Sequence, residues 1–146
     1  MKSERIKRIS LWTIRYGVHK YAVDQGIVVI DARISVGLDL CKPSANLVYN
    51  YRNAGKEIQL QQEDFLRGYY EELENSYLRN KPSWQSLLRA KRLAVSCEHT
   101  VDDPMAHRHI LKFFLCNIAV DNDYEVMHGS EIRCDTRNKT VLMRYE

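Results

Sequence analysis

Short apolar runs separated by polar and glycine-containing stretches mark the strands of this chain. Arg8–Tyr16 alternates apolar and polar side chains and predicts a first strand, which Gly17 ends. Ile27–Ile30 is a continuous β-branched run, typical of a strand buried on both faces. Leu93–Cys97 has the same apolar character and predicts another buried strand.

Helical periodicity occupies much of the rest. Gln61–Arg79 carries aromatic or aliphatic side chains at four-residue steps, beginning at Phe65, and predicts a helix. Further helices are predicted at His19–Gln25, Ser83–Lys91 and Pro104–Ile118.

The segment Ser35–Gln59 has little periodicity and predicts a long loop with short helical pieces. Tyr49, Tyr51 and Arg52 could make this loop a lid or a base-stacking surface. Tyrosines also tie loops onto a core, and that interpretation is favoured.

The C-terminal part predicts more strands, at Tyr124–Met127, Ile132–Cys134 and Thr140–Tyr145, with the last two joined as a hairpin across Asp135–Lys139. Helices that alternate with buried strands predict a single α/β domain over residues 1–146. We expect three layers, with a mainly parallel sheet, helices on both faces and an antiparallel addition at the end.

Composition narrows the functional classes. The net charge of +3 permits an anionic ligand but is far below that of most nucleic-acid-binding domains. No apolar run approaches the roughly 20 residues that cross a membrane, and no secretory apolar core follows Met1. We therefore expect a cytoplasmic protein without a membrane partner, whose four widely spaced cysteines are reduced.

Candidate catalytic side chains follow the buried strands. Asp31 comes directly after Ile30, and Cys97 and Glu98 end the run that starts at Leu93. Open α/β sheets bind their ligands at the carboxyl ends of strands, so Asp31 or Glu98 could act as general base or nucleophile. Asp31 could instead simply pair with Arg33. Cys97 is a candidate thiol nucleophile, or else a small buried filler.

The start of the helix after Cys97 is predicted to favour an anion. Asp103 suits the N-cap and Pro104 the first helical position, which puts His107, Arg108 and His109 in the first turns. Cationic groups beside free amide groups and the positive end of the helix dipole suit a phosphate or carboxylate.

We assign His107 as a proton carrier near neutral pH. The predicted ligand-binding residues are Tyr16, Arg33, Arg108 and His109.

Four motifs resemble domain-of-unknown-function family 488, a group of small bacterial and phage proteins. They are Thr13-Ile14-Arg15-Tyr16-Gly17, Ile30-Asp31-Ala32-Arg33, Cys97-Glu98, and Ala106-His107-Arg108-His109-Ile110-Leu111. The resemblance implies a Rossmann-like fold with a polar cluster at the strand ends, and no established activity. Ala106 stands where the family has a cysteine, and Arg15 where it has a glycine. Either change is consistent with an enzyme that has become a binding protein.

Three functional hypotheses follow. The first is a hydrolase or transferase that acts on a nucleotide, nucleoside or nucleic-acid phosphate. The second is a non-catalytic phage-type protein that sequesters a nucleotide or binds a host protein. The third is zinc binding through Cys97-x-His99 and His107-x-His109, although residues two apart on a helix lie about 200° apart. The predicted partner is an anionic small molecule or a nucleic-acid phosphate, with no cofactor and no metal ligand among the assigned residues.

Overall fold

A computed structural model describes residues 6–53, 58–99 and 106–146 of the chain. Its centre is a five-stranded sheet in the order β2-β3-β1-β4-β5. The strands are β1 (Lys7–Arg15), β2 (Val28–Asp31), β3 (Arg92–Cys97), β4 (Tyr124–Asp135) and β5 (Thr140–Leu142). The first four in this order are parallel, and β5 pairs with β4 in the antiparallel sense. The α/β class, the mainly parallel sheet of Rossmann-like folds and the C-terminal hairpin are thus confirmed.

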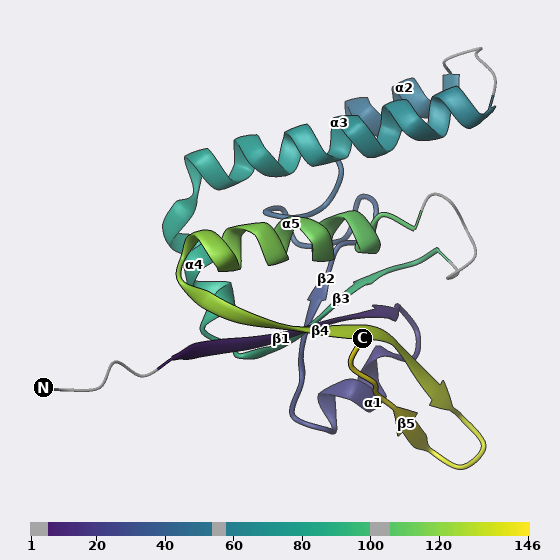
Figure 1. Ribbon diagram of the computed structural model, residues 1–146. Coiled ribbons are helices and arrows are strands. Elements are labelled where there is room, and N and C mark those ends of the chain that lie inside the picture. Colours follow the sequence, from purple (N-terminus) through teal and green to yellow (C-terminus); the bar gives the residue numbers. More distant parts are fainter. Residues whose placement is uncertain (1–5, 54–57, 100–105) are drawn as a thin grey trace, which may run out of the picture.

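The described residues form five helices. They are α1 (His19–Val23), α2 (Ala45–Asn53), α3 (Ile58–Arg79), α4 (Lys81–Leu88) and α5 (Arg108–Asp121). Most of them pack on the sheet, while α2 packs on α3. Helices α3 and α5 lie above the sheet as drawn in Figure 1, and α1 lies below it. Among the described residues, none of these helices is long and apolar enough to span a membrane.

The two faces of the sheet bury cores of unequal size. Alternate residues of β3 point to opposite faces, so Leu93 and Val95 join the large core that α3, α4 and α5 cover. Ala94 joins the smaller core on the other face, together with Trp12 and Ala22 of α1. Helix α1 and the C-terminal hairpin cover this smaller core, whereas α3, α4 and α5 cover the larger one. One face of the sheet is therefore covered more thinly than the other.

Two elements differ in extent from the sequence prediction. Residues 45–53 form one continuous helix inside the predicted loop, because Val48 packs on Phe65 of α3. The strands predicted at Tyr124–Met127 and Ile132–Cys134 are one strand, β4, whose register with β1 shifts between Leu11 and Thr13. The sheet therefore extends through the polar segment that interrupts the apolar pattern.

Helix starts were also misplaced. Helix α5 begins at Arg108 and not at Pro104, with His107 at the N-cap; the predicted capping residues Asp103 and Pro104 lie outside the described residues. Helix α4 begins at Lys81, two residues before the predicted N-cap Ser83. Proline at position 82 is compatible with a first helical turn, which explains why it does not delay the start.

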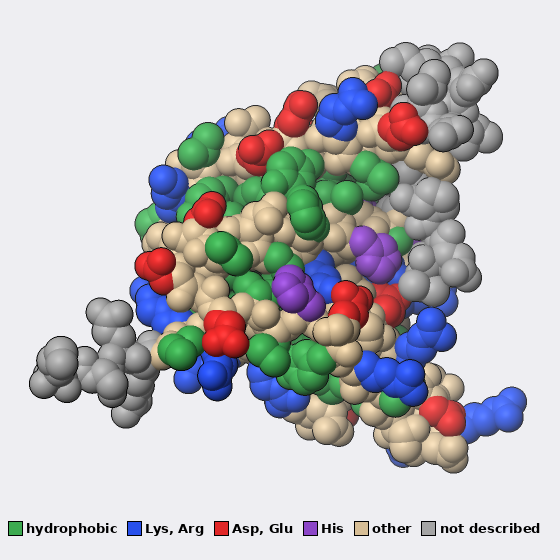
Figure 2. Space-filling model, viewed as in Figure 1, with side chains coloured by type: hydrophobic (Ala, Val, Ile, Leu, Met, Phe, Trp, Pro, Cys, Tyr) green, Lys and Arg blue, Asp and Glu red, His purple; other side chains and the backbone are tan. Residues whose placement is uncertain are grey.

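The outer surface of α3 and α5 combines charged and apolar side chains. Figure 2 shows hydrophobic side chains gathered where α3 lies across α5, with acidic and basic side chains interspersed over the same face. Phe113 of α5 is 58% exposed and its ring lies 6.0 Å from that of Tyr70. In the described part of this face, basic side chains do not gather into one patch.

Candidate functional site

The carboxyl ends of β1 and β3 form a switch point in the sheet. These neighbouring parallel strands lead to helices on opposite faces, because α1 follows β1 and α5 follows β3. Open α/β sheets bind their ligands at such switch points. The backbone N–H of Tyr16 donates to the Cys97 carbonyl at 3.0 Å, and that of Ala32 donates to Ser96 at 2.7 Å, so the ends of β1, β2 and β3 meet here.

Asp31, Arg33 and Tyr16 form one layered group at this edge. The Arg33 guanidinium donates to both Asp31 carboxylate oxygens at 2.9–3.1 Å and lies 3.5 Å above the Tyr16 ring centre. Burial raises the pKa of the Asp31 carboxyl, but the hydrogen bonds and charge of Arg33 outweigh it and hold that pKa below its ordinary value. The pairing of Asp31 with Arg33, which the sequence left open, is therefore present.

Glu98 lies beside this group and contacts the loop after β2. Its two carboxylate oxygens both accept from the backbone N–H of Ile34, at 3.2 Å each. The Glu98 side chain is 39% exposed, and its Oε1 lies 3.8 Å from Nε2 of His99. Of the predicted catalytic carboxylates, Glu98 is thus the one without a guanidinium partner in the described structure.

Cys97 and His107 are buried behind Glu98, and the thiol and imidazole influence each other. Burial raises the pKa of the Cys97 thiol, yet contact with His107 and Arg108 outweighs burial, so the pKa is lowered. For His107 burial lowers the pKa, and contact with Cys97 reverses the direction. Both residues have no exposed surface. The electrostatics suit a reactive thiolate, but the burial suits the filler role that the sequence also allowed.

Arg108 is committed to protein partners. Its Nε and Nη2 donate to the two carboxylate oxygens of Glu131 at 2.8 and 2.6 Å, and its Nη1 donates to the His99 carbonyl at 2.5 Å. The side chain is fully buried. Arg108 therefore braces the helix start against β3 and β4, and in this arrangement it offers no exposed donor to an anion.

His109 does not join the other predicted residues. It is exposed on α5, and its partial desolvation and the charge of Arg108 lower its pKa. Its other charged neighbours are Glu131 and Lys112, not Glu98. The helical separation from His107 that the sequence predicted accounts for this placement.

A groove of about 950 Å³ lies between α3 and the segment that follows β2. We call it the α2–α3 groove; it is lined by residues of 34–52 and of 72–80. Tyr69 donates to the Cys41 carbonyl at 2.5 Å and Ser76 to the Leu40 carbonyl at 2.9 Å, which fixes the groove floor beneath α3. Ser44 caps α2 by accepting from the Leu47 N–H at 3.1 Å.

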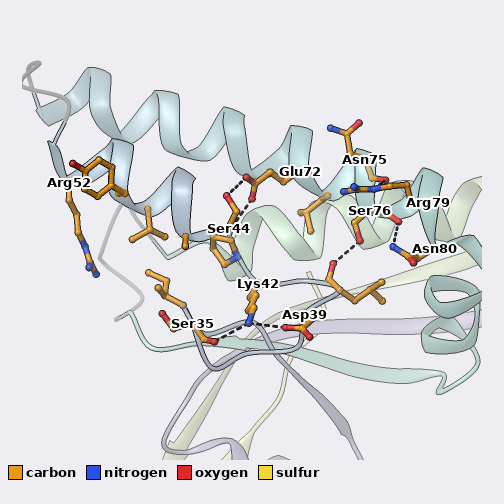
Figure 3. A pocket seen from close by; sticks show the side chains of 17 residues that line it. Ser35, Asp39, Lys42, Ser44, Arg52, Glu72, Asn75, Ser76, Arg79 and Asn80 are labelled. Atoms are coloured by element: carbon orange, nitrogen blue, oxygen red, sulfur yellow. Dashed lines mark hydrogen bonds and ion pairs between the residues drawn. The ribbon is translucent and has the colours of Figure 1, made fainter.

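The groove wall mixes polar and apolar side chains and carries two arginines, of which Arg79 donates from Nε to the Asn75 carbonyl at 3.3 Å. Arg52 lies toward one end and Arg79 toward the other (Figure 3), and neither has a carboxylate ion-pair partner among the described residues. Lys42, between them, pairs with Asp39 at 2.8 Å. Glu72 is occupied as well, since it accepts from the Ser44 N–H at 2.8 Å and hydroxyl at 2.5 Å.

Sequence reasoning missed two parts of this arrangement. Glu131 lies in the middle of β4, and nothing in its local pattern identifies it as the partner of a residue 23 positions earlier. Arg79 lies in the last turn of the amphipathic helix α3, and nothing in that pattern indicates that it lines a groove. Tyr49 and Arg52, which the sequence analysis names as candidates for a lid or stacking surface, do line the groove. The ring of Tyr51 instead packs on that of Phe65, with 5.4 Å between the ring centres, and ties this segment to the core.

No protein-family model, curated protein or solved structure matches this chain. The resemblance to domain-of-unknown-function family 488 therefore rests on the four motifs and stays a prediction.

Proposed function

We propose that the chain binds a nucleotide-like, phosphate-bearing ligand in the α2–α3 groove and hydrolyses or transfers it at Glu98. The groove volume of about 950 Å³ lies within the range of small-molecule sites and exceeds what a nucleotide needs. Its hydroxyl and amide side chains suit a sugar or base, and Arg52 and Arg79 suit phosphate oxygens.

Ile34 carries the proposal because it belongs to both regions. Its side chain lines the groove, and its backbone N–H is the group that Glu98 accepts from. A ligand that fills the groove to this end would approach the Glu98 carboxylate. The reacting group would then lie at the carboxyl edge of the sheet, beside the switch point.

In the proposed hydrolysis, Glu98 acts as general base. It accepts a proton from a water molecule whose oxygen bonds to phosphorus, while the bond from phosphorus to the leaving oxygen breaks and solvent protonates that oxygen. Arg33 would neutralise charge on the phosphate, since its side chain keeps 26% exposure although it is paired with Asp31.

The relationship to family 488, a bacterial or phage source and a cytoplasmic location belong to the same proposal. The family's polar motifs supply Asp31 and Arg33 on one segment and Cys97 and Glu98 on another. Their convergence at one sheet edge supports the relationship.

Glu98→Gln tests the catalytic part. Against a panel of nucleoside mono-, di- and triphosphates, we expect this variant to lose at least about 100-fold in turnover, within the range that one general base contributes. Its dissociation constant should stay within about threefold, because the amide is isosteric. Glu71→Gln, an exposed carboxylate on α3, is the matched control and should leave both values unchanged. Unaltered turnover in Glu98→Gln would refute the assignment.

A non-catalytic binding protein is the second candidate, and one observation favours it. Asp31 is bound to Arg33, and Cys97 and His107 have no exposed surface, so three of the four predicted catalytic groups are occupied or inaccessible. Wild-type protein that retains a nucleotide through native mass spectrometry but does not turn it over would support this candidate over the enzyme.

A further inference from the structure

We propose that Glu98, His99 and His107 form a binding site for a divalent transition-metal ion, with zinc as the best match. Each of the three offers one ligand atom, and these atoms all lie within 4.8 Å of one another. The set differs from the zinc ligands suggested by the sequence, because the carboxylate of Glu98 takes part and Cys97 and His109 do not.

His107 has the hydrogen bonding of a metal-binding histidine. Its Nε2 lies 2.5 Å from the carbonyl oxygen of Ala32, and since a carbonyl only accepts, Nε2 carries the hydrogen. The lone pair of the neutral ring is then on Nδ1. That atom is buried without a hydrogen-bond partner among the residues that the structure describes. Metal-bound histidines typically donate their second N–H to a carbonyl or carboxylate in this way.

The other two side chains are held from outside the cluster. Ile34 donates its N–H to the Glu98 carboxylate, and the buried Arg108 donates to the backbone carbonyl of His99. The rings of His99 and His107 lie 5.7 Å apart at 78°, an arrangement in which both can face one point. The backbone on both sides of the site is therefore fixed before an ion binds.

The geometry fits a small ion after a modest adjustment. Bonds of about 2.0–2.2 Å to a tetrahedral ion imply ligand atoms about 3.4 Å apart, so the side chains must close by up to about 1.4 Å. Two histidines and one glutamate are a known catalytic zinc set, which leaves the fourth position to water. If the proposed function also holds, Glu98 would hold the ion instead of acting as general base, and the ion would activate the attacking water.

Metal binding can be measured without any nucleotide. Chelator-treated protein is titrated with Zn²⁺ by calorimetry and with Co²⁺ by visible absorption, which is intense only for four- or five-coordinate sites. We expect one ion per chain in the wild-type protein. Glu98→Gln and His99→Gln should each weaken binding at least about tenfold, the loss that even outer partners of metal ligands produce. Both side chains are partly exposed, so these variants should keep the wild-type circular dichroism.

His128→Gln is the matched control, since it removes an exposed histidine on β4 away from the cluster. It should bind like the wild type. Absence of stoichiometric binding, or equal weakening in His128→Gln, would overturn the metal site. The result separates from the proposed function: nucleotide turnover by a protein that binds no zinc refutes only the metal site, whereas zinc binding without nucleotide binding refutes only the groove proposal.

Discussion

Arg108 and Glu131 form a two-bond ion pair between the start of α5 and the middle of β4. The bonds measure 2.8 and 2.6 Å, and the guanidinium is fully buried while the carboxylate side chain is 13% exposed. The remaining Arg108 nitrogen donates to the His99 carbonyl. One side chain therefore connects α5 and β4 to the end of β3, where Glu98 and His99 lie.

Breaking this pair should destabilise the protein strongly. Glu131→Gln or Arg108→Met leaves one charge buried without its partner, which typically costs about 3–5 kcal/mol. We expect urea denaturation to show a loss of this size in the free energy of unfolding. Arg8→Met removes another arginine that pairs with a β4 glutamate, Glu125, but this pair is exposed and should contribute under about 1 kcal/mol. Equal losses in buried and exposed variants would contradict the brace.

The same pair should make stability depend on pH in the acid range. Burial raises the pKa of the Glu131 carboxyl, but hydrogen bonds and charge from Arg108 prevail and hold it below its usual value of 4.5. A carboxyl whose pKa is lower in the folded state stabilises the protein above the unfolded pKa, and this contribution is lost as the pH falls through the folded one. The stability difference between wild type and Glu131→Gln should therefore be full near neutrality and shrink below pH 4.5. Urea midpoints at stepped pH measure it, and a difference constant down to strong acid would contradict the assignment.

The sequence predicted the parallel strands well because burial on both faces leaves continuous apolar runs such as Ile27–Ile30. It predicted only short helical pieces where α2 forms, because the continuous helix depends on Val48 packing against Phe65, a contact 17 residues away that leaves no local periodicity. It also split β4, since the strand continues through polar residues on the strength of pairing with β1. Local patterns indicate which side chains an element buries. The bounds of α2 and β4 depend instead on the neighbouring elements that they contact.

The candidate site shows the same division. Chain order and strand ends correctly predicted that Asp31, Glu98 and His107 converge, because parallel strands end at a common edge. The individual role of Arg108 was less accessible, since its partner Glu131 comes from a distant strand. From the sequence, a cation at a helix start predicts an anion site. The structure shows that the carboxylate of Glu131 already pairs with Arg108.

The cations of the α2–α3 groove should determine affinity for a phosphate-bearing ligand. Arg52→Ala and Arg79→Ala each remove a guanidinium that has no carboxylate partner among the described residues. Loss of one charge-assisted hydrogen bond costs about 1.5–3 kcal/mol, so the dissociation constant for a bound nucleotide should rise at least about tenfold. Arg67→Ala, on the same helix α3 but outside the groove and paired with Asp64, should leave affinity unchanged. Equal affinities in all three variants would place the ligand elsewhere.

The four thiols should divide into two classes. Cys41 and Cys97 are buried, and burial raises the pKa of Cys41 to about 12, whereas Cys116 and Cys134 are partly exposed. Iodoacetamide at mildly alkaline pH should therefore modify Cys116 and Cys134 in folded protein, and all four thiols in urea. Peptide mass spectrometry identifies the labelled positions. Modification of Cys97 as fast as that of Cys134 would show that its surroundings open in solution, and would restore the thiol as a candidate nucleophile.

Close packing at Gly129 should make this position intolerant of any side chain. A Cβ atom added there would overlap the buried indole of Trp12, which fills the smaller core and cannot move without disturbing it. Gly129→Ala should therefore lower the free energy of unfolding by about 1–3 kcal/mol, the usual cost of overpacking. Gly68→Ala is the informative comparison. Its added Cβ would lie 2.6 Å from Cδ1 of Leu47, the end of a flexible side chain, and alanine is favoured over glycine inside a helix by about 0.5–1 kcal/mol. We expect thermal denaturation to place Gly68→Ala close to wild type and Gly129→Ala well below it; the reverse order would contradict the close approach of β4 to Trp12.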